Sequence, residues 1–86
     1  MGNDSYPVKL TSSATSTLKS VFLYDVCINK TLTGTMTIQE GVTVLANFAV
    51  GTPVGNYHTL PNGGRYANLQ FVLSAADDVT VYVKTA

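Results

Sequence analysis

The stretch TLTGTMTIQEGVTVLANFAV, residues 31–50, decides the fold class of this chain. In its first half, apolar residues such as Met36 and Ile38 alternate with threonines, and an acidic-glycine pair at residues 40–41 then precedes a second alternating run. Strict apolar-polar alternation is typical of a half-buried β-strand, because successive side chains point to opposite faces of a sheet. We therefore predict a β-hairpin here, with β-branched threonines forming an uncharged solvent face.

The same period of two residues recurs along most of the chain. Further alternating runs lie at residues 8–10, 68–74 and 79–83. Turn signals separate the runs, and PNGG at residues 61–64 is the strongest of them, because Asn-Gly supplies the positive φ angles of tight turns. About seven strands spaced by turns predict an all-β chain, a small antiparallel β-sandwich or jelly-roll-like barrel.

One predicted strand breaks the simple pattern. In TLKSVFLYDVCIN, residues 17–29, apolar side chains occupy both faces of the middle. We interpret this segment as a strand covered on both sides, with the core on one face and a neighbouring subunit as one explanation for the other.

The amino-acid composition of the chain changes near residue 16. Residues 1–16 combine a polar start, a short strand-like piece around Val8 and a Ser/Thr-rich stretch. We predict an edge strand behind a frayed terminus, or else an arm that adds a strand to the sheet of a neighbour. Residues 17–86 then form the β-sandwich domain.

The length, the charge balance and the numbers of cysteine and histidine residues limit the kinds of partner that the chain can bind. A chain of 86 residues makes one small domain with a marginal core, and such domains often need disulfides, a metal or a partner subunit. Cys27 is the single cysteine and His58 the single histidine, which leaves oligomerisation or docking on a larger body. Five basic residues balance five acidic ones, so we expect no nucleic-acid binding. We also expect no membrane span, because no apolar stretch approaches ~20 residues.

Groups that carry chemistry are few. His58 lacks a partner or nucleophile motif, and Cys27 sits between apolar neighbours, so we interpret both as structural or surface residues. The pair Asp77-Asp78 resembles part of a calcium loop but lacks its other spaced oxygen ligands, which favours a turn-capping role. We predict no catalytic residue, no metal site, no cofactor and no enzyme activity.

Aromatic and arginine side chains are the better candidates for function. Tyrosine and arginine are enriched where proteins meet, although a strand tyrosine with a wet hydroxyl is an equally good interpretation of each. The candidate interface residues are Tyr6, Val8, Tyr24, Tyr57, Arg65 and Tyr66.

Three segments of the sequence, taken together, resemble a known group of proteins. They are LKSVFLYDVCIN, GTMTIQEGVTVLANFAV and GNYHTLPNGGRYANLQFVLSAADDVTVYVK, the last of which contains ADDVTVYV at residues 76–83. Over residues 17–84 this arrangement resembles small β-sandwich virion proteins of tailed bacteriophages. The resemblance implies a structural protein made in the host cytoplasm and carried on the capsid surface. There it would act as a decoration (cement) protein or head fibre, often a homotrimer, bound to the major capsid protein or another virion protein. The short chain favours decoration over a fibre.

Other functions stay open. A carbohydrate- or receptor-binding module of a fibre or tail would stack Tyr24, Tyr57, Tyr66 or Tyr82 on a sugar and bond its hydroxyls with Asn62 or Asp78. The absence of tryptophan counts against this hypothesis. A small enzyme that uses His58 and Cys27 is the weakest of the three.

Overall fold

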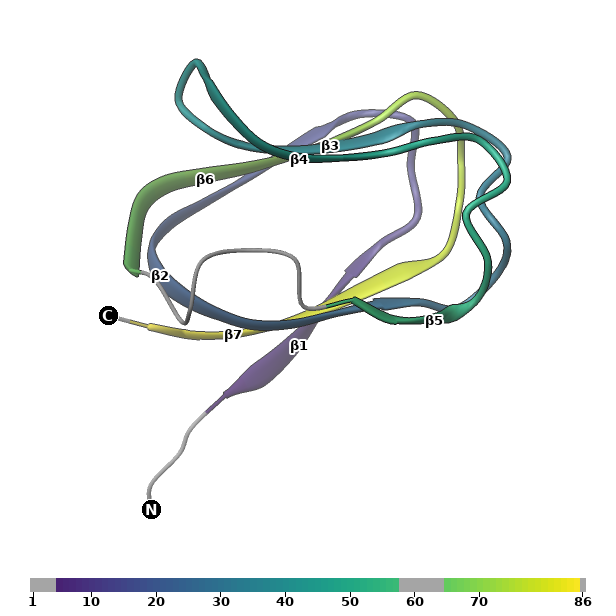
Figure 1. Ribbon diagram of the computed structural model, residues 1–86. Coiled ribbons are helices and arrows are strands. Elements are labelled where there is room, and N and C mark those ends of the chain that lie inside the picture. The colour runs from purple at the N-terminus through teal and green to yellow at the C-terminus, as the bar shows by residue number, and fades with distance from the viewer. Residues whose placement is uncertain (1–4, 58–64, 86) are drawn as a thin grey trace.

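The computed structural model describes residues 5–57 and 65–85, and they form a β-sheet structure without a helix. The strands, shown in Figure 1, are β1 (Tyr6–Leu10), β2 (Thr15–Ile28), β3 (Met36–Glu40), β4 (Thr43–Phe48), β5 (Gly55–Tyr57), β6 (Arg65–Leu73) and β7 (Val79–Thr85). All the strand pairs are antiparallel. The predicted all-β class and the expected number of strands are confirmed, with an architecture consistent with a small sandwich or barrel. The predictions for His58, for Asn62 and for the turn at 61–64 fall outside the described residues.

The sheet is continuous and folds over on itself. Its strand order is β1-β7-β2-β6-β3-β4, and β5 adds to β2. In Figure 1 one layer holds β4, β3, β6 and the start of β2, here called the β3 layer, and the other holds β1, β7, β5 and the end of β2, here called the β7 layer. The hydrophobic side chains of both layers meet in the space between them.

Strand β2 belongs to both layers. Its first part pairs with β6, as in Leu18 opposite Leu69, and its second part pairs with β7, as in Ile28 opposite Val79. Figure 1 shows β2 sweeping around one end of the molecule from the upper layer to the lower. A strand that changes layers must also change which of its residues face the core.

The first change of facing occurs at Ser20. This residue has a φ of 51°, the one positive value at a non-glycine residue in the described part of the chain. Before it, the half-buried Leu18 faces the core, and after it the buried Val21 does, so the alternation shifts by one residue. Strand β6 makes the same shift opposite, where Tyr66 and Leu69 are both buried.

The second change of facing is a β-bulge at Tyr24. Leu23 pairs with Val83 and Asp25 with Tyr82, so Tyr24 is an extra residue without an opposite partner on β7. A bulge shifts the alternation by one position and bends the strand. These two shifts explain why apolar residues occupy both faces of the alternation in this segment.

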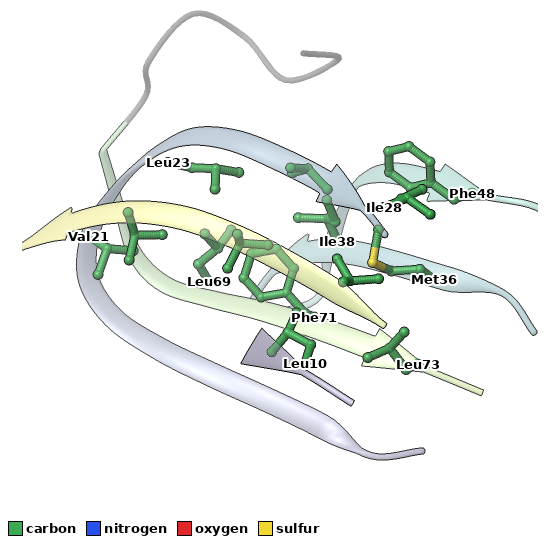
Figure 2. Close-up of a cluster of buried hydrophobic side chains, with 14 of the residues drawn as sticks. Leu10, Val21, Leu23, Ile28, Met36, Ile38, Phe48, Leu69, Phe71 and Leu73 are labelled. Carbon is green, nitrogen blue, oxygen red and sulfur yellow. The ribbon is translucent and has the colours of Figure 1, made fainter. Parts of the chain in front are cut away.

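The core is continuous across both layers. Figure 2 shows side chains from β1, β2, β3, β4, β6 and β7 packed together, among them Ile38, Leu69 and Phe71. These three side chains are fully buried, and such burial stabilises a fold by ~1.5–3 kcal/mol per large apolar side chain. The core residues are Leu10, Val21, Leu23, Val26, Ile28, Leu32, Met36, Ile38, Phe48, Tyr66, Leu69, Phe71, Leu73, Val79, Val81 and Val83.

The first half of the stretch at residues 31–50 keeps its predicted alternation but forms a shorter strand, whereas a bulge at Leu45 shifts the alternation of the second half and leaves Val44 exposed. Leu32 and Gly34 are buried together with the inner residues of β3, yet β3 begins only at Met36. The reason is that the backbone amides before it bond to side chains and loops instead of to a neighbouring strand. The hairpin closes through Gly41, whose φ is 59°, and Val42, a placement of glycine that suits a two-residue type II′ turn.

The connections between layers gather at one end of the sandwich. Residues 11–14, 29–35, 49–54 and 74–78 all cross between layers there, on the right of Figure 1. At the start of the chain, β1 pairs with β7 of the same chain and contributes Leu10 to the core. The division of the chain at residue 16 into an arm and a domain stays a prediction.

The positive φ of Ser20 yields a stability prediction. A β-branched side chain is strained in this conformation. The free energy of unfolding of Ser20→Val should therefore be ~1–3 kcal/mol lower than that of Ser20→Gly. Urea denaturation of both variants measures the difference. Thr17→Val, at an exposed extended position of the same strand, is the control and should change stability by less than ~0.5 kcal/mol. Equal stability of the valine and glycine variants would contradict a left-handed residue at position 20.

Candidate functional site

The predicted interface residues do not form one cluster. Tyr6 and Val8 lie on β1, Tyr24 on the bulge of β2, Tyr57 on β5, and Arg65 and Tyr66 at the start of β6. Their exposure divides them further, because only part of the set reaches the surface.

Tyr57 and Tyr66 face the interior. Tyr66 is 6% exposed and belongs to the core, and burial together with the nearby charge of Glu40 raises the pKa of its hydroxyl. Tyr57 packs edge-to-face on Phe48 with ring centroids 5.4 Å apart, and its hydroxyl donates to the Pro53 carbonyl at 2.6 Å. Tyr66 is buried and so offers little to a partner, whereas Tyr57 is half-buried and keeps part of its surface accessible.

Tyr6 and Val8 lie at the edge of the β7 layer. The register pairs them with Val83 and Val81, which places both on the core-facing side of β1. Val8 is half-buried and packs against the core, whereas Tyr6, at the first position of the strand, is 40% exposed. Their accessible part is therefore a strand edge instead of a flat face.

The outer face of the β7 layer gathers exposed aromatic groups. Tyr24 is 47% exposed and Tyr82 is 37% exposed, and the register places Tyr82 between Pro7 on β1 and Asp25 on β2. The bulge puts Tyr24 next to Asp25, where regular alternation would have turned one of them inward. We call this surface the tyrosine face; its members are Pro7, Phe22, Tyr24, Asp25, Tyr82 and Lys84.

Arg65 borders the tyrosine face. It is exposed and pairs with Phe22, which in turn pairs with Lys84 on the other side of β2. A half-buried phenylalanine thus lies between two basic residues on adjacent strands. Of the six candidates, Tyr24 lies on this exposed face and Arg65 lies beside it. The other members of the face, Pro7, Phe22, Asp25, Tyr82 and Lys84, are not among the predicted interface residues. The apolar residues on both faces of residues 17–29 were the signal for Phe22.

Asp25 lies within this face and is held by its surroundings. Its carboxylate accepts hydrogen bonds from the Val26 amide at 2.9 Å and from the Asn56 side chain at 3.0 Å. The Cys27 thiol also donates to it at 3.6 Å. Burial and the neighbouring carboxylate raise the pKa of Cys27, which disfavours the reactive thiolate.

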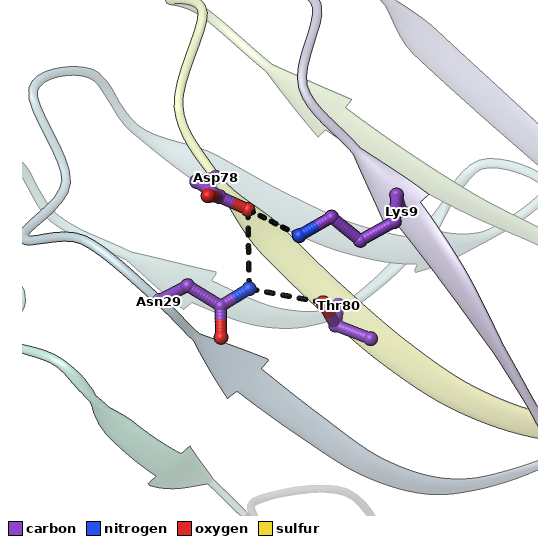
Figure 3. Close-up of polar contacts among 4 residues, drawn as sticks. All are labelled: Lys9, Asn29, Asp78 and Thr80. Atoms are coloured by element: carbon purple, nitrogen blue, oxygen red, sulfur yellow. Dashed lines mark hydrogen bonds and ion pairs between the residues drawn. The ribbon is translucent and has the colours of Figure 1, made fainter.

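Asp78 joins three strands at the other end of the β7 layer. Its Oδ1 accepts from Lys9 Nζ at 2.8 Å and from Asn29 Nδ2 at 3.1 Å, and Asn29 also donates to Thr80 at 2.9 Å (Figure 3). The hydrogen bonds from Lys9 and Asn29 lower the pKa of Asp78. The Lys9–Asp78 contact is the one ion pair found within residues 5–57 and 65–85.

Asp77 points the opposite way and is buried. One oxygen accepts from the Thr33 amide at 2.8 Å and from the Thr33 hydroxyl at 2.9 Å, and the other accepts from the Gly34 amide at 3.1 Å. These donors lie in the connection before β3, whereas Asp77 lies in the connection before β7. The carboxylate therefore links two of the connections that cross between the layers. It accepts hydrogen bonds from backbone amides that do not pair with another strand. This role joins distant segments, whereas the predicted turn-capping role would be local.

The pKa of Asp77 follows from these bonds. Burial alone would raise it, but the hydrogen bonds from Thr33 and Gly34 and the charge of Lys30 outweigh burial and hold it below the ordinary value of 3.8. The ionised form is therefore the one that stabilises the fold.

The described residues contain no cluster of three or more His, Cys, Asp or Glu side chains that could hold a metal ion. Within the same residues, no helix is long and apolar enough to cross a membrane. No family model, curated protein or solved structure matches the chain.

Asp77 generates a pH prediction. Its pKa is lower in the folded chain than in the unfolded chain, so its contribution is fully present above about pH 4 and is lost as the pH falls through the folded pKa. Asp77→Asn turns one acceptor into a donor that faces the Gly34 amide, which should cost ~1–3 kcal/mol at neutral pH. Urea denaturation between pH 2 and pH 7 should show a smaller loss of stability on acidification for this variant than for the wild type.

Asp78→Asn is the matched control, because it alters an exposed carboxylate one residue away. It should cost less than Asp77→Asn and leave most of the acid-dependent loss in place. An Asp77→Asn variant as stable and as acid-sensitive as the wild type would contradict the role of this carboxylate.

Gly34 generates a packing prediction at the same place. A Cβ atom here would lie 2.5 Å from Ser74 Oγ and 2.7 Å from Ala75 Cβ, so Gly34→Ala should destabilise the fold by ~1–3 kcal/mol. Gly55→Ala is the control, since its Cβ would meet nothing nearer than 3.6 Å. Thermal unfolding of both variants tests this, and equal melting temperatures would show that the connections can separate at little cost.

Proposed function

We propose that this chain is a structural protein of a bacteriophage virion, a decoration protein that binds the assembled head and stabilises it. The proposal combines the resemblance of residues 17–84 to small virion β-sandwiches with the exposed tyrosine face. In this view the protein is made in the host cytoplasm and ends on the capsid surface. Its partner is the major capsid protein or another virion protein.

The tyrosine face is the observation that supports binding to protein. Tyr24 and Tyr82 are exposed on one surface, with Phe22 and Lys84 beside them and Arg65 at the border. Tyrosine and arginine supply large contact area at interfaces, and polar groups at the rim complete it. The core residues beneath make this face a fixed platform, so that little ordering would accompany binding.

The mechanism of such a protein is mechanical. A ligand that binds the assembled shell better than its separate parts stabilises the shell by mass action. Each copy needs only a modest contact, because many symmetric copies act together. The resemblance implies a homotrimer, but head binding by many symmetric copies does not depend on how many copies associate in free solution.

A second candidate function rests on the same two tyrosines. Their exposed rings could stack on a sugar, with Asp25 beside them as a hydrogen-bond acceptor, as in a carbohydrate- or receptor-binding module. Asp78 lies at the other end of the β7 layer, so it would bond only a longer glycan. Tyr66 is buried, and the half-buried Tyr57 packs its ring on Phe48 away from Tyr24 and Tyr82, so this alternative rests on the two exposed tyrosines. A glycan array separates the two functions, because only the second one gives binding to an isolated glycan.

The decoration proposal predicts a defined binding defect. Heads of the phage that encodes the chain, purified from a strain without its gene, should bind the added protein in a sedimentation assay. The double variant Tyr24→Ala, Tyr82→Ala should bind at least ~10-fold more weakly, equivalent to ~1.4 kcal/mol. Thr15→Ala, Thr17→Ala removes two exposed side chains from β2 in the β3 layer and serves as the control.

Three outcomes would count against the proposal. The chain could be absent from purified virions by mass spectrometry, the heads could fail to bind it, or the threonine control could lose as much binding as the tyrosine variant. Loss of head binding together with retained glycan binding would favour the second function.

A further inference from the structure

The strand order β1-β7-β2-β6-β3-β4 ends in two edge strands that differ in chemistry, and the three-residue β5, which pairs only with β2 among the described strands, lies off this order. At one end of the strand order, β1 carries Pro7 and Lys9. Proline lacks a backbone donor and lysine resists desolvation, so both residues discourage another strand from pairing with this edge. At the other end, β4 pairs with β3 and has no second neighbour among the described strands.

Strand β4 lacks these protective residues. Its sequence TVLANF contains no charge and no proline. The uncharged stretch extends well beyond the strand, since no Asp, Glu, Lys or Arg occurs at residues 41–57. A bulge at Leu45 adds local twist, yet it leaves the outward backbone donors and acceptors of β4 without a paired strand in the described part of the chain.

Two exposed valines belong to the hairpin of β3 and β4, and two more lie in the connection that follows the other end of β4. Val42 at the hairpin tip is 96% exposed and Val44 on β4 is 52% exposed. Val50 and Val54 in the connection from β4 to β5 are also exposed, and these four are the exposed valines of the described residues. The turn that carries Val42 projects from the β3 layer at the upper left of Figure 1. An apolar, uncharged edge of this kind is an aggregation hazard when it stays uncovered.

We infer that the β4 edge is a self-association surface, at which β4 pairs antiparallel with β4 of a second copy. A row of unpaired backbone groups is complementary to another extended strand. Antiparallel pairing of a strand with its own copy obeys two-fold symmetry, so each copy satisfies the other through the same residues. The β3 layer would then continue across the two-fold axis as one sheet.

Charge favours a second copy of β4 as the occupant. A two-fold pairing places each residue near its own equivalents, and like charges opposite each other destabilise a strand pair. Strand β4 brings no charge to such a contact, whereas β1 would bring Lys9 close to its symmetry mate. Apolar, charge-free surfaces are also characteristic of permanent homodimers, while transient partners meet through more polar surfaces.

Light scattering coupled to size exclusion tests the inference on the full chain over a dilution series. We expect a mass of two copies for the wild type and a shift to one copy for Val44→Lys. The dissociation constant of the dimer should be at least 10-fold higher for this variant. Val54→Lys is the matched control: it makes the same substitution at a valine of similar exposure, 59%, outside β4, and it should remain a dimer. Circular dichroism of each variant establishes that it is folded.

Hydrogen exchange of the wild type gives a second readout that needs no variant. Amides of β4 should become more protected as concentration rises, while those of β1 should not change. A monomer at every concentration, a mass of three copies, or a Val44→Lys variant as dimeric as the Val54→Lys control would each overturn the inference. These outcomes are independent of head binding, so they distinguish it from the decoration proposal.

Discussion

A strand that serves two layers is the constraint on which the rest of this structure depends. Strand β2 must bury one set of side chains against the β3 layer and another against the β7 layer. Because side chains alternate along a strand, a change of layer without a change of facing would turn the apolar residues of one half outward. Ser20 and the bulge at Tyr24 provide the two corrections, and both layers keep one core.

The tyrosine face is a by-product of the second correction. The extra residue in β2 places Tyr24 and Asp25 on the same side of the strand, and Tyr82 lies opposite Asp25 on β7. A regular strand would have directed one of these side chains into the core. Bulges re-aim side chains, and here the bulge brings two polar side chains to the outer face beside Tyr82.

The end of the sandwich with the crossings has a different source of stability. There the backbone leaves the sheet, and its amides need other acceptors. Asp77 accepts from Thr33 and Gly34 in a buried place, so these bonds matter more than the exposed Lys9–Asp78 ion pair, which contributes little after solvent screening.

Much of the fold could be predicted from local pattern, and the site could be predicted only in part. Alternation identified the strands because burial on one face of a sheet imposes a period of two. It could not locate the shift at Ser20, since serine does not mark a positive φ as glycine does. Tyr66 entered the predicted interface on residue type alone, but its burial depends on the facing of β6. The donors to Asp77 lie 44 residues away or nearly so, a separation that no local pattern reports.

The pairing of β1 with β7 has a consequence for the order in which the molecule is built. Tyr6 lies opposite Val83, so the first and last described strands are neighbours in the sheet. During synthesis β1 leaves the ribosome before the other described strands, and its partner β7 is the last of them to appear. Closing so long a loop is entropically costly, and sheets dominated by distant contacts form slowly. The sheet can therefore close at β1 only after β7 has emerged from the ribosome, and until then β1 lacks the strand with which it pairs.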